Sequence, residues 1–191
     1  MKGRDLTPPQ TVGPFFHGLL REGLNMLVAP KTLGDRIRIE GHVYDGNRTP
    51  VSDAMIEIWQ ANERGHYSHP ADQRVASLDP AFAGFGRTGT DEAGHYWFET
   101  IRPGRVPFGK SGDQAPHLNV AVSARGLLHH LFTRLYFDDE AAANARDPVL
   151  RGIPEDRRST MVAKKIIADG KTVYRLDIVL QGQDETVFFD L

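Results

Sequence analysis

The chain has 191 residues, no cysteine, and a formal net charge of -2 at pH 7 from 23 basic and 25 acidic side chains. The length suits one domain, and the lack of cysteine excludes disulfides, cysteine nucleophiles and cysteine-based zinc sites. The interspersed charges offer no basic field to nucleic acid or an anionic membrane, and no apolar stretch reaches the length of a membrane span or signal-peptide core, so we expect a cytoplasmic protein with neither partner.

The first 34 residues predict an extended arm, because they contain four prolines, at positions 8, 9, 14 and 30. A proline biases the residue before it toward extended backbone, so the run from Thr7 to Phe16 is not expected to be helical. Two roles suit such an arm: a strap across the chain's own core, or a contact with a partner, which the aromatic pair Phe15 and Phe16 favours. We therefore divide the chain into an arm, 1–34, that contacts a partner subunit, and one domain, 35–191.

Alternation of apolar and polar residues predicts the strands of that domain. In 36–44 the residues Ile37, Ile39, Gly41 and Val43 share one face, and 54–60 alternates in the same way; a hairpin and a sheet-to-sheet crossover both suit this pair. The other strands are expected at 85–90 and 95–101, joined by a turn at 91–94, and at 117–124, 131–137, 164–168, 172–180 and 186–189. One or two short helices follow Asp138. The pattern predicts an all-β sandwich with long loops.

The Pro/Gly-rich stretch 102–124 delivers His117 and Asn119 at the start of an apolar strand. Residues two apart in a strand share a face, which is the geometry of a metal-binding pair. Imidazole is a good ligand for a transition metal, but a carboxamide is a weak one and Val106 has no donor. From the residues alone we expect a structural histidine. The long loop 61–84 adds Tyr67, flanked by His66 and His69, and loops of this length are usually functional.

Four stretches together resemble the intradiol ring-cleavage dioxygenases: TPPQTVGPFFH, GHVYDGNRTPVSDAMIEIWQAN, FGRTGTDEAGHYWFETIRPG, and APHLNVAVSARG followed by LFTRLYFDDEAAANARDPVL. The resemblance runs from Thr7 to Leu191 and implies a β-sandwich of the intradiol dioxygenase type. It implies that catalytic beta-type chains of the family hold Fe(III) with two tyrosines and two histidines, ligands that suit ferric iron. Those four ligand positions fall here on Tyr67, Val106, His117 and Asn119. Half the ligand set is lost, so the site is expected to be vestigial and to bind no metal.

The resemblance further implies an alpha-type, non-catalytic chain whose partner is a beta-type subunit that binds the Fe(III). The residues expected to line a pocket shared with that subunit are Thr11, Gly13, Pro14 and Phe15 of the arm, together with Arg125. The implied reactants at the shared site are protocatechuate and O2. A cation at the entrance would steer and orient the carboxylate of protocatechuate, although a solvated charge at a strand end is the ordinary interpretation of Arg125.

The sequence allows two other interpretations. The first, a self-sufficient intradiol enzyme with unusual ligands, is opposed by Val106 and Asn119. The second is a free-standing transthyretin-like β-sandwich that binds a ligand without ring chemistry. The loops and the Pro-rich arm are longer than such a module needs. The order of the motifs favours the non-catalytic subunit.

Overall fold

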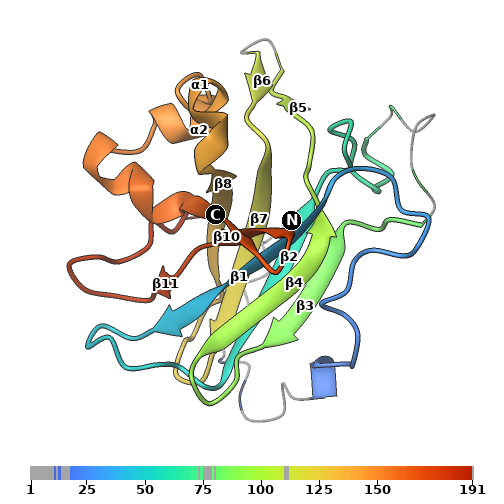
Figure 1. Cartoon of the computed structure of the whole chain (residues 1–191). Helices are drawn as coiled ribbons and strands as arrows, with labels where there is room; N and C mark the ends of the chain where they lie inside the picture. The colour runs from blue at the N-terminus through green and yellow to red at the C-terminus, as the bar shows by residue number, and fades with distance from the viewer. Residues whose placement is uncertain are drawn as a thin grey trace, which may run out of the picture.

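The computed structural model describes residues 11, 13, 18–72, 74, 79, 81–109 and 112–190, which form a β-sandwich with short helices at one end (Figure 1). The all-β prediction is therefore confirmed. Among these residues, no helix is long and apolar enough to cross a membrane. The strands are β1 (Arg36–Tyr44), β2 (Ala54–Gln60), β3 (Phe85–Gly89), β4 (His95–Ile101), β5 (Val106–Pro107), β6 (Asp113–Gln114), β7 (His117–Ala124), β8 (Leu131–Phe137), β9 (Val162–Ala168), β10 (Lys171–Arg175) and β11 (Ile178–Val179). The helices are the 3-10 turns η3 (Asp138–Glu140) and η4 (Glu155–Met161) and the α-helices α1 (Ala141–Asn144) and α2 (Pro148–Arg151).

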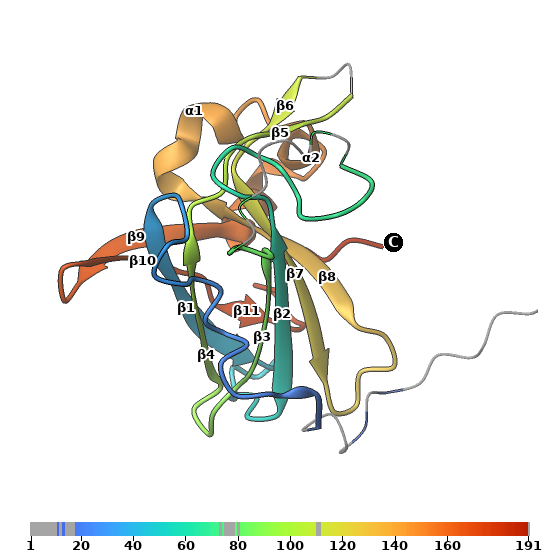
Figure 2. The same ribbon diagram turned by 90° about the vertical axis from the view of Figure 1, so that its right-hand side faces the viewer.

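Two sheets face each other across the core. In the first, β1 lies between antiparallel β4 and parallel β10 and β11. In the second, the antiparallel order is β8, β7, β2 and β3. A parallel pairing of β8 with β9, Tyr136 beside Val162 and Phe137 beside Ala163, joins them. Figure 2 shows β1 and β4 of one layer beside β2, β7 and β8 of the other.

The predicted alternation places apolar side chains in the core. Ile37, Ile39 and Val43 of β1 are buried, and Ile56 and Ile58 of β2 meet them from the opposite sheet. Burying an aliphatic side chain of this size contributes roughly 1.5–3 kcal/mol, so these strands carry much of the stability of the sandwich.

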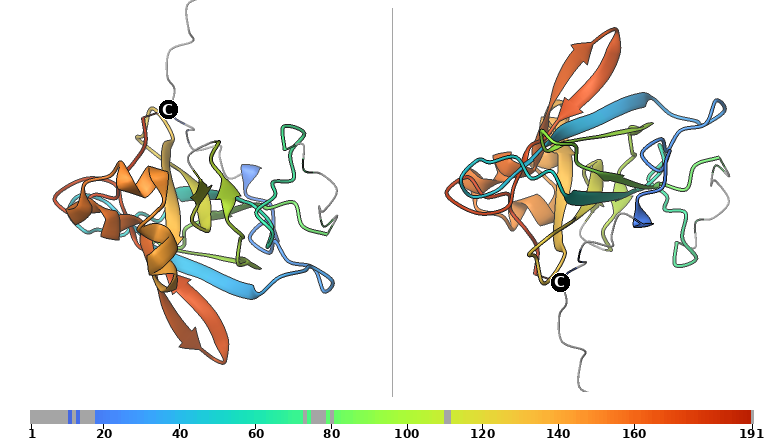
Figure 3. Two further views of the ribbon diagram at one scale, coloured as in Figure 1. Left: turned by 90° about the horizontal axis from the view of Figure 1, so that it is seen from above. Right: turned by 90° about the horizontal axis from the view of Figure 1, so that it is seen from below.

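The strand connections refine the sequence prediction. β1 and β2 belong to different sheets, so the segment between them is a crossover and not a hairpin. The turn at 91–94 likewise joins β3 to β4 across the two sheets. The predicted strand 172–180 is divided into β10 and β11, and the strand expected at 186–189 is wrong, because only Phe189 pairs, in an isolated bridge with Phe132. The β9–β10 hairpin projects from the body (Figure 3).

A short strap, Leu24–Leu27, closes the open side of the sandwich between β3 and β4. The amide of Leu27 donates to the carbonyl of Glu99 at 2.8 Å, and the amide of Glu99 donates to Asn25 at 2.9 Å. On the other sheet, the amide of Arg87 donates to the carbonyl of Leu24 at 3.1 Å. The last part of the 1–34 segment therefore contacts the chain's own sheets. The division of the chain at residue 34 stays a prediction.

Candidate functional site

His117 begins β7 and is buried, with only 1% of its surface exposed. Its Nδ1 lies 2.8 Å from the carbonyl oxygen of Ala115, so Nδ1–H donates there and Nε2 keeps a free electron pair. Burial, reinforced by the positive charge of Arg134, lowers the pKa of His117 to about 4. The imidazole is therefore neutral near pH 7 and presents Nε2 to its surroundings.

Tyr67 is brought to this histidine by a loop anchored on the segment after β4. Gly65 has φ +80, and a Cβ there would lie 1.8 Å from the carbonyl oxygen of Arg105, so only glycine permits the close approach. The amide of Tyr67 donates to Oδ2 of Asp72 at 2.9 Å. The phenol oxygen lies 3.4 Å from Nε2 of His117. Burial raises the pKa of Tyr67, so the phenol stays protonated and serves as donor to His117.

Asn119 completes the contact between the three residues. Its Nδ2 donates to Oη of Tyr67 at 3.0 Å and to the carbonyl oxygen of Trp59 at 3.2 Å. Its Oδ1 accepts a hydrogen bond from Nε of Arg134 at 3.2 Å. Both ends of the carboxamide are therefore occupied by protein groups.

Arg134 lies beside this cluster, because register pairs Arg134 of β8 with Asn119 of β7. Its Nη1 donates to Oε1 of Gln114 at 2.7 Å and to Oη of Tyr136 at 3.3 Å. The Tyr136 hydroxyl in turn donates to Oδ1 of the buried Asp147 at 3.2 Å. A guanidinium is thus fixed within the candidate site by three neutral acceptors.

Val106 is buried in β5, where it pairs with Gln114 of β6, next to the group that binds Arg134. It offers no donor atom. Fe(III) needs several anionic or imidazole ligands. The cluster offers one imidazole, one protonated phenol and a carboxamide whose two ends are already hydrogen-bonded, and a fixed cation lies beside them. These residues therefore do not fit Fe(III). Over the described part of the chain, no group of three or more His, Cys, Asp or Glu side chains could hold a metal ion.

A cavity of about 580 Å³ opens at this cluster. Its lining includes Trp59, Tyr67 and Asn119, with His69, Asp72 and Arg74 at the loop side. The ring of His69 packs against Trp59 with centroids 5.5 Å apart, so this histidine is an aromatic wall and not part of the Tyr67 network. The side chains that line the cavity do not form a metal-binding cluster among the described residues.

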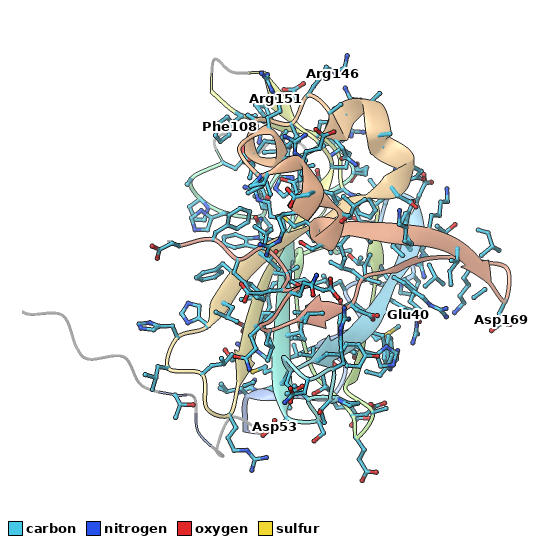
Figure 4. All side chains as sticks on the ribbon, turned by 90° about the vertical axis from the view of Figure 1, so that its left-hand side faces the viewer. Glu40, Asp53, Phe108, Arg146, Arg151 and Asp169 are labelled. Carbon is cyan, nitrogen blue, oxygen red and sulfur yellow. The ribbon has the colours of Figure 1, made fainter. Side chains whose placement is uncertain are left out.

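Arg125 lies at the opposite end of the sandwich from this cavity. It directly follows β7, whose eight residues span about 25 Å at roughly 3.4 Å per residue. Its side chain is 76% exposed, and its Nε lies 2.8 Å from Oδ2 of Asp53. Figure 4 shows Asp53 at the end of the molecule away from Phe108, the residue after β5.

Leu20 of the arm lies at the same end of the sandwich as Arg125. Leu20 lies against Gly89 at the end of β3, and Gly89 shares the partner Met55 with Ser123, two residues before Arg125. Thr11 is exposed, and no heavy atom of the described residues lies within 4 Å of where a Cβ on Gly13 would be. Pro14 and Phe15 lie outside the described residues. The expected role of these positions at a shared pocket stays a prediction.

Sequence reasoning missed the residues that surround the cluster, namely Trp59, Gln114, Arg134, Tyr136 and Asp147. One signal was present: Arg134 interrupts the apolar strand LFTRLYF at a position on the same face as Tyr136. Its proximity to Asn119 depends on the register of β7 with β8, which the alternation pattern does not specify.

Several dioxygenases are similar to this chain in sequence and fold. The Dioxygenase family model (Dioxygenase_C) matches residues 13–182. The protocatechuate 3,4-dioxygenase alpha chain of Burkholderia cepacia is 46% identical over 97% of this chain and 97% of its own length. The beta chain of the same organism is 35% identical over 93% of this chain and 76% of its own. Among solved structures, the dioxygenase domain of a carbohydrate-binding fusion protein from Streptomyces sp. SirexAA-E has a TM-score of 0.63 and 26% identity, covering 94% of this chain and 100% of that domain.

Proposed function

The chain belongs to the family of intradiol ring-cleavage dioxygenases, and we propose that within it this chain is the non-catalytic alpha-type subunit of a protocatechuate 3,4-dioxygenase. The assembly would use O2 to open the ring of protocatechuate between its two hydroxyl carbons, giving 3-carboxy-cis,cis-muconate in the beta-ketoadipate pathway of aromatic catabolism. Two observations together carry the proposal. The chain is similar to an alpha chain over 97% of its sequence, and at the expected ligand positions Asn119 is hydrogen-bonded to Arg134 and is not free to bind a metal.

We assign the Fe(III) of this assembly to a beta-type partner. The donors at Tyr67 and His117 are bonded to protein groups, and the other two ligand positions offer a carboxamide and an alkyl group. When bound by the partner, ferric iron would supply Lewis-acid activation of the catecholate. The contribution of this chain is then to shape the space in which the partner binds substrate.

The location of the arm and of Arg125 supports that assignment of roles. Leu20, through its contact with Gly89, and Arg125 lie at one end of the sandwich, about 25 Å from the cavity at Tyr67 by the length of β7, so a partner bound at that end would meet both. Arg125 is highly exposed, and an exposed guanidinium paired with one carboxylate can exchange that partner for a substrate carboxylate. We propose that Thr11, Gly13, Pro14, Phe15 and Arg125 line the mouth of the partner's site.

Expression of this chain alone, of a beta-type chain alone, and of both together tests the proposal. We expect iron in proportion to the beta-type chain, the ferric-tyrosinate colour only where that chain is present, and oxygen uptake with protocatechuate that increases when both are combined. Iron and colour in this chain alone would overturn the assignment of the metal. Oxygen uptake by the beta-type chain that is unchanged by this chain would overturn the partnership. Fractionation of cells would test the cytoplasmic location that the proposal includes.

A further inference from the structure

The Arg134 guanidinium has no acidic partner in the described structure. None of the ion pairs of the described residues includes Arg134. Its hydrogen-bond acceptors are the amide oxygens of Asn119 and Gln114 and the hydroxyl of Tyr136, which are all neutral. A half-buried cation without a counter-ion is unfavourable, and an anion that binds it is stabilised by the low local dielectric constant.

Asp147 makes no direct contact with that charge. Asp147 is separated from Arg134 by the hydroxyl of Tyr136, and its oxygens already accept hydrogen bonds from the amides of Ala115, Val149 and Leu150 as well as from Tyr136. The carboxylate of Asp147 is thus committed to capping α2 and anchoring the segment before β7. Nε and Nη1 carry all the Arg134 contacts named above, so among the described residues the two N–H groups of Nη2 have no acceptor and can donate to a ligand.

A second cavity, of about 380 Å³, adjoins the guanidinium. It is lined by Asn119, Phe132, Thr133, Arg134, Val149 and Phe189. The amide of Phe189 donates to the carbonyl of Phe132 at 2.8 Å, which fixes the C-terminal segment as one wall. The size lies near the lower end of the range for ligand pockets, about 300–1,000 Å³.

We propose that this pocket binds an aromatic carboxylate, with the carboxylate on Arg134 and the ring between Phe132, Phe189 and Val149. Guanidinium and carboxylate match in a two-bond geometry, and aromatic walls favour a planar ring over an aliphatic chain. The pocket has one cation, Arg134, which favours a ligand with a single negative charge over a dianion. Its three apolar side chains favour a ligand with a ring over a phosphate. Asp190, the exposed residue after Phe189, further disfavours dianions.

The pocket is lined by residues of this chain. It does not depend on the proposed subunit role, and its failure would leave that role untouched. A second ligand site for a molecule of the substrate's chemical class would let the chain respond to the supply of aromatic acids.

Titration of the full-length chain with benzoate and with benzamide, which has the same ring and no charge, tests the proposal. Calorimetry gives both affinities, and the 1H–15N signals of the arginine side chains report the contact directly. We expect benzoate to bind at least about tenfold more tightly than benzamide, with the Nε–H signal of Arg134 shifting on saturation. Equal affinities for the two compounds, or no binding of either, would overturn the proposal.

Four substitutions distinguish the contribution of the Arg134 charge to binding from that of the apolar walls of the pocket. Arg134→Gln should bring the two affinities to within about twofold, while Arg134→Lys, which keeps the charge but not the fork, should retain part of the preference. Phe189→Ala should weaken both compounds alike and preserve their ratio, so it remains informative if Arg134→Gln does not fold. Arg151→Gln removes an exposed cation from the neighbouring α2 and should change nothing. Loss of the preference in Arg151→Gln as large as in Arg134→Gln would mean a general charge effect and would refute the site.

Discussion

Nε of Arg134 donates to Oδ1 of Asn119 across 3.2 Å, so a fixed positive charge lies beside the carboxamide at the position that the family resemblance assigns to a histidine ligand. This contact opposes metal binding in addition to the missing donor atoms. Asn119 could turn its amide oxygen toward a metal ion only by giving up its bond to Arg134.

Restoring the ligands alone should therefore fail to restore metal binding. We expect Val106→Tyr with Asn119→His to stay nearly iron-free, because the Arg134 guanidinium opposes the net positive charge that Fe(III) keeps even with two tyrosinate ligands. Adding Arg134→Gln should raise the bound iron severalfold and produce a tyrosinate absorption band. Iron analysis and visible spectroscopy of the double and triple variants check this. The same iron content in both would show that Arg134 has no such effect.

The stability of the chain should fall between pH 6.5 and 4 because of His117. Its pKa is lowered from 6.5 to about 4, so the folded protein keeps this imidazole neutral while the unfolded chain binds a proton. Stability from this group is complete above pH 6.5 and is lost as the pH falls toward 4, by roughly 3 kcal/mol. Urea unfolding at a series of pH values measures the loss.

His117→Gln should flatten that profile, whatever it does to stability at neutral pH. His129→Gln, which removes an exposed histidine from the β7–β8 loop, is the matched control and should run parallel to the wild type. A His117→Gln profile as steep as the wild type would assign the pH dependence to other groups.

Arg125→Ala should raise KM for protocatechuate in the assembly more than it lowers kcat. A carboxylate contact made equally in the ground and transition states acts on binding and not on the chemical step. A charge-assisted contact contributes on the order of 1–3 kcal/mol, so kcat/KM should fall roughly tenfold, and less at high salt. Oxygen-uptake kinetics of the co-expressed subunits measure both constants.

Catechol, which lacks the carboxylate, should be turned over equally well by Arg125→Ala and the wild type. Arg64→Ala is the protein control, since Arg64 is 65% exposed, also pairs with a carboxylate, and lies in the loop at the other end of the sandwich. Equal losses for both substrates would indicate an effect on assembly, and no loss for either would remove Arg125 from the pocket.

The chain alone should self-associate through the outer face of β2 and β3. Trp59 and Phe85 pair across these strands and are 40% and 43% exposed, and both line one hollow with Phe132. Obligate interfaces commonly exceed about 2,000 Å², and an aromatic face of this kind is left open without the partner. Light scattering should show oligomers that a beta-type chain disperses.

Trp59→Ser with Phe85→Ser should shift the chain alone toward monomer. Ile167→Thr is the control, because Ile167 is 67% exposed but lies on the projecting β9–β10 hairpin. A monodisperse wild-type monomer would argue against this interface, as would dispersal by Ile167→Thr alone.

Strand positions were predictable because burial leaves a period of two in the sequence, as in 36–44. Strand partners were not, since the turn at 91–94 has the composition of a hairpin turn although it connects two sheets. The positions of Tyr67, Val106, His117 and Asn119 followed from family resemblance. The role of Arg134 could not be predicted, because a single charged residue in an apolar strand does not indicate which residue lies opposite it in the sheet. That information resides in the pairing of β7 with β8.

The strap has a consequence for the order of events during synthesis. Leu24 bonds to Arg87 and Leu27 to Glu99, so the ribosome releases the strap before either of the strand edges that it covers. After β3 and β4 have formed and before the strap closes on them, their unpaired edges are open to other nascent chains. Closure of the strap is therefore expected among the last steps of folding, because the strand edges that it covers must form first.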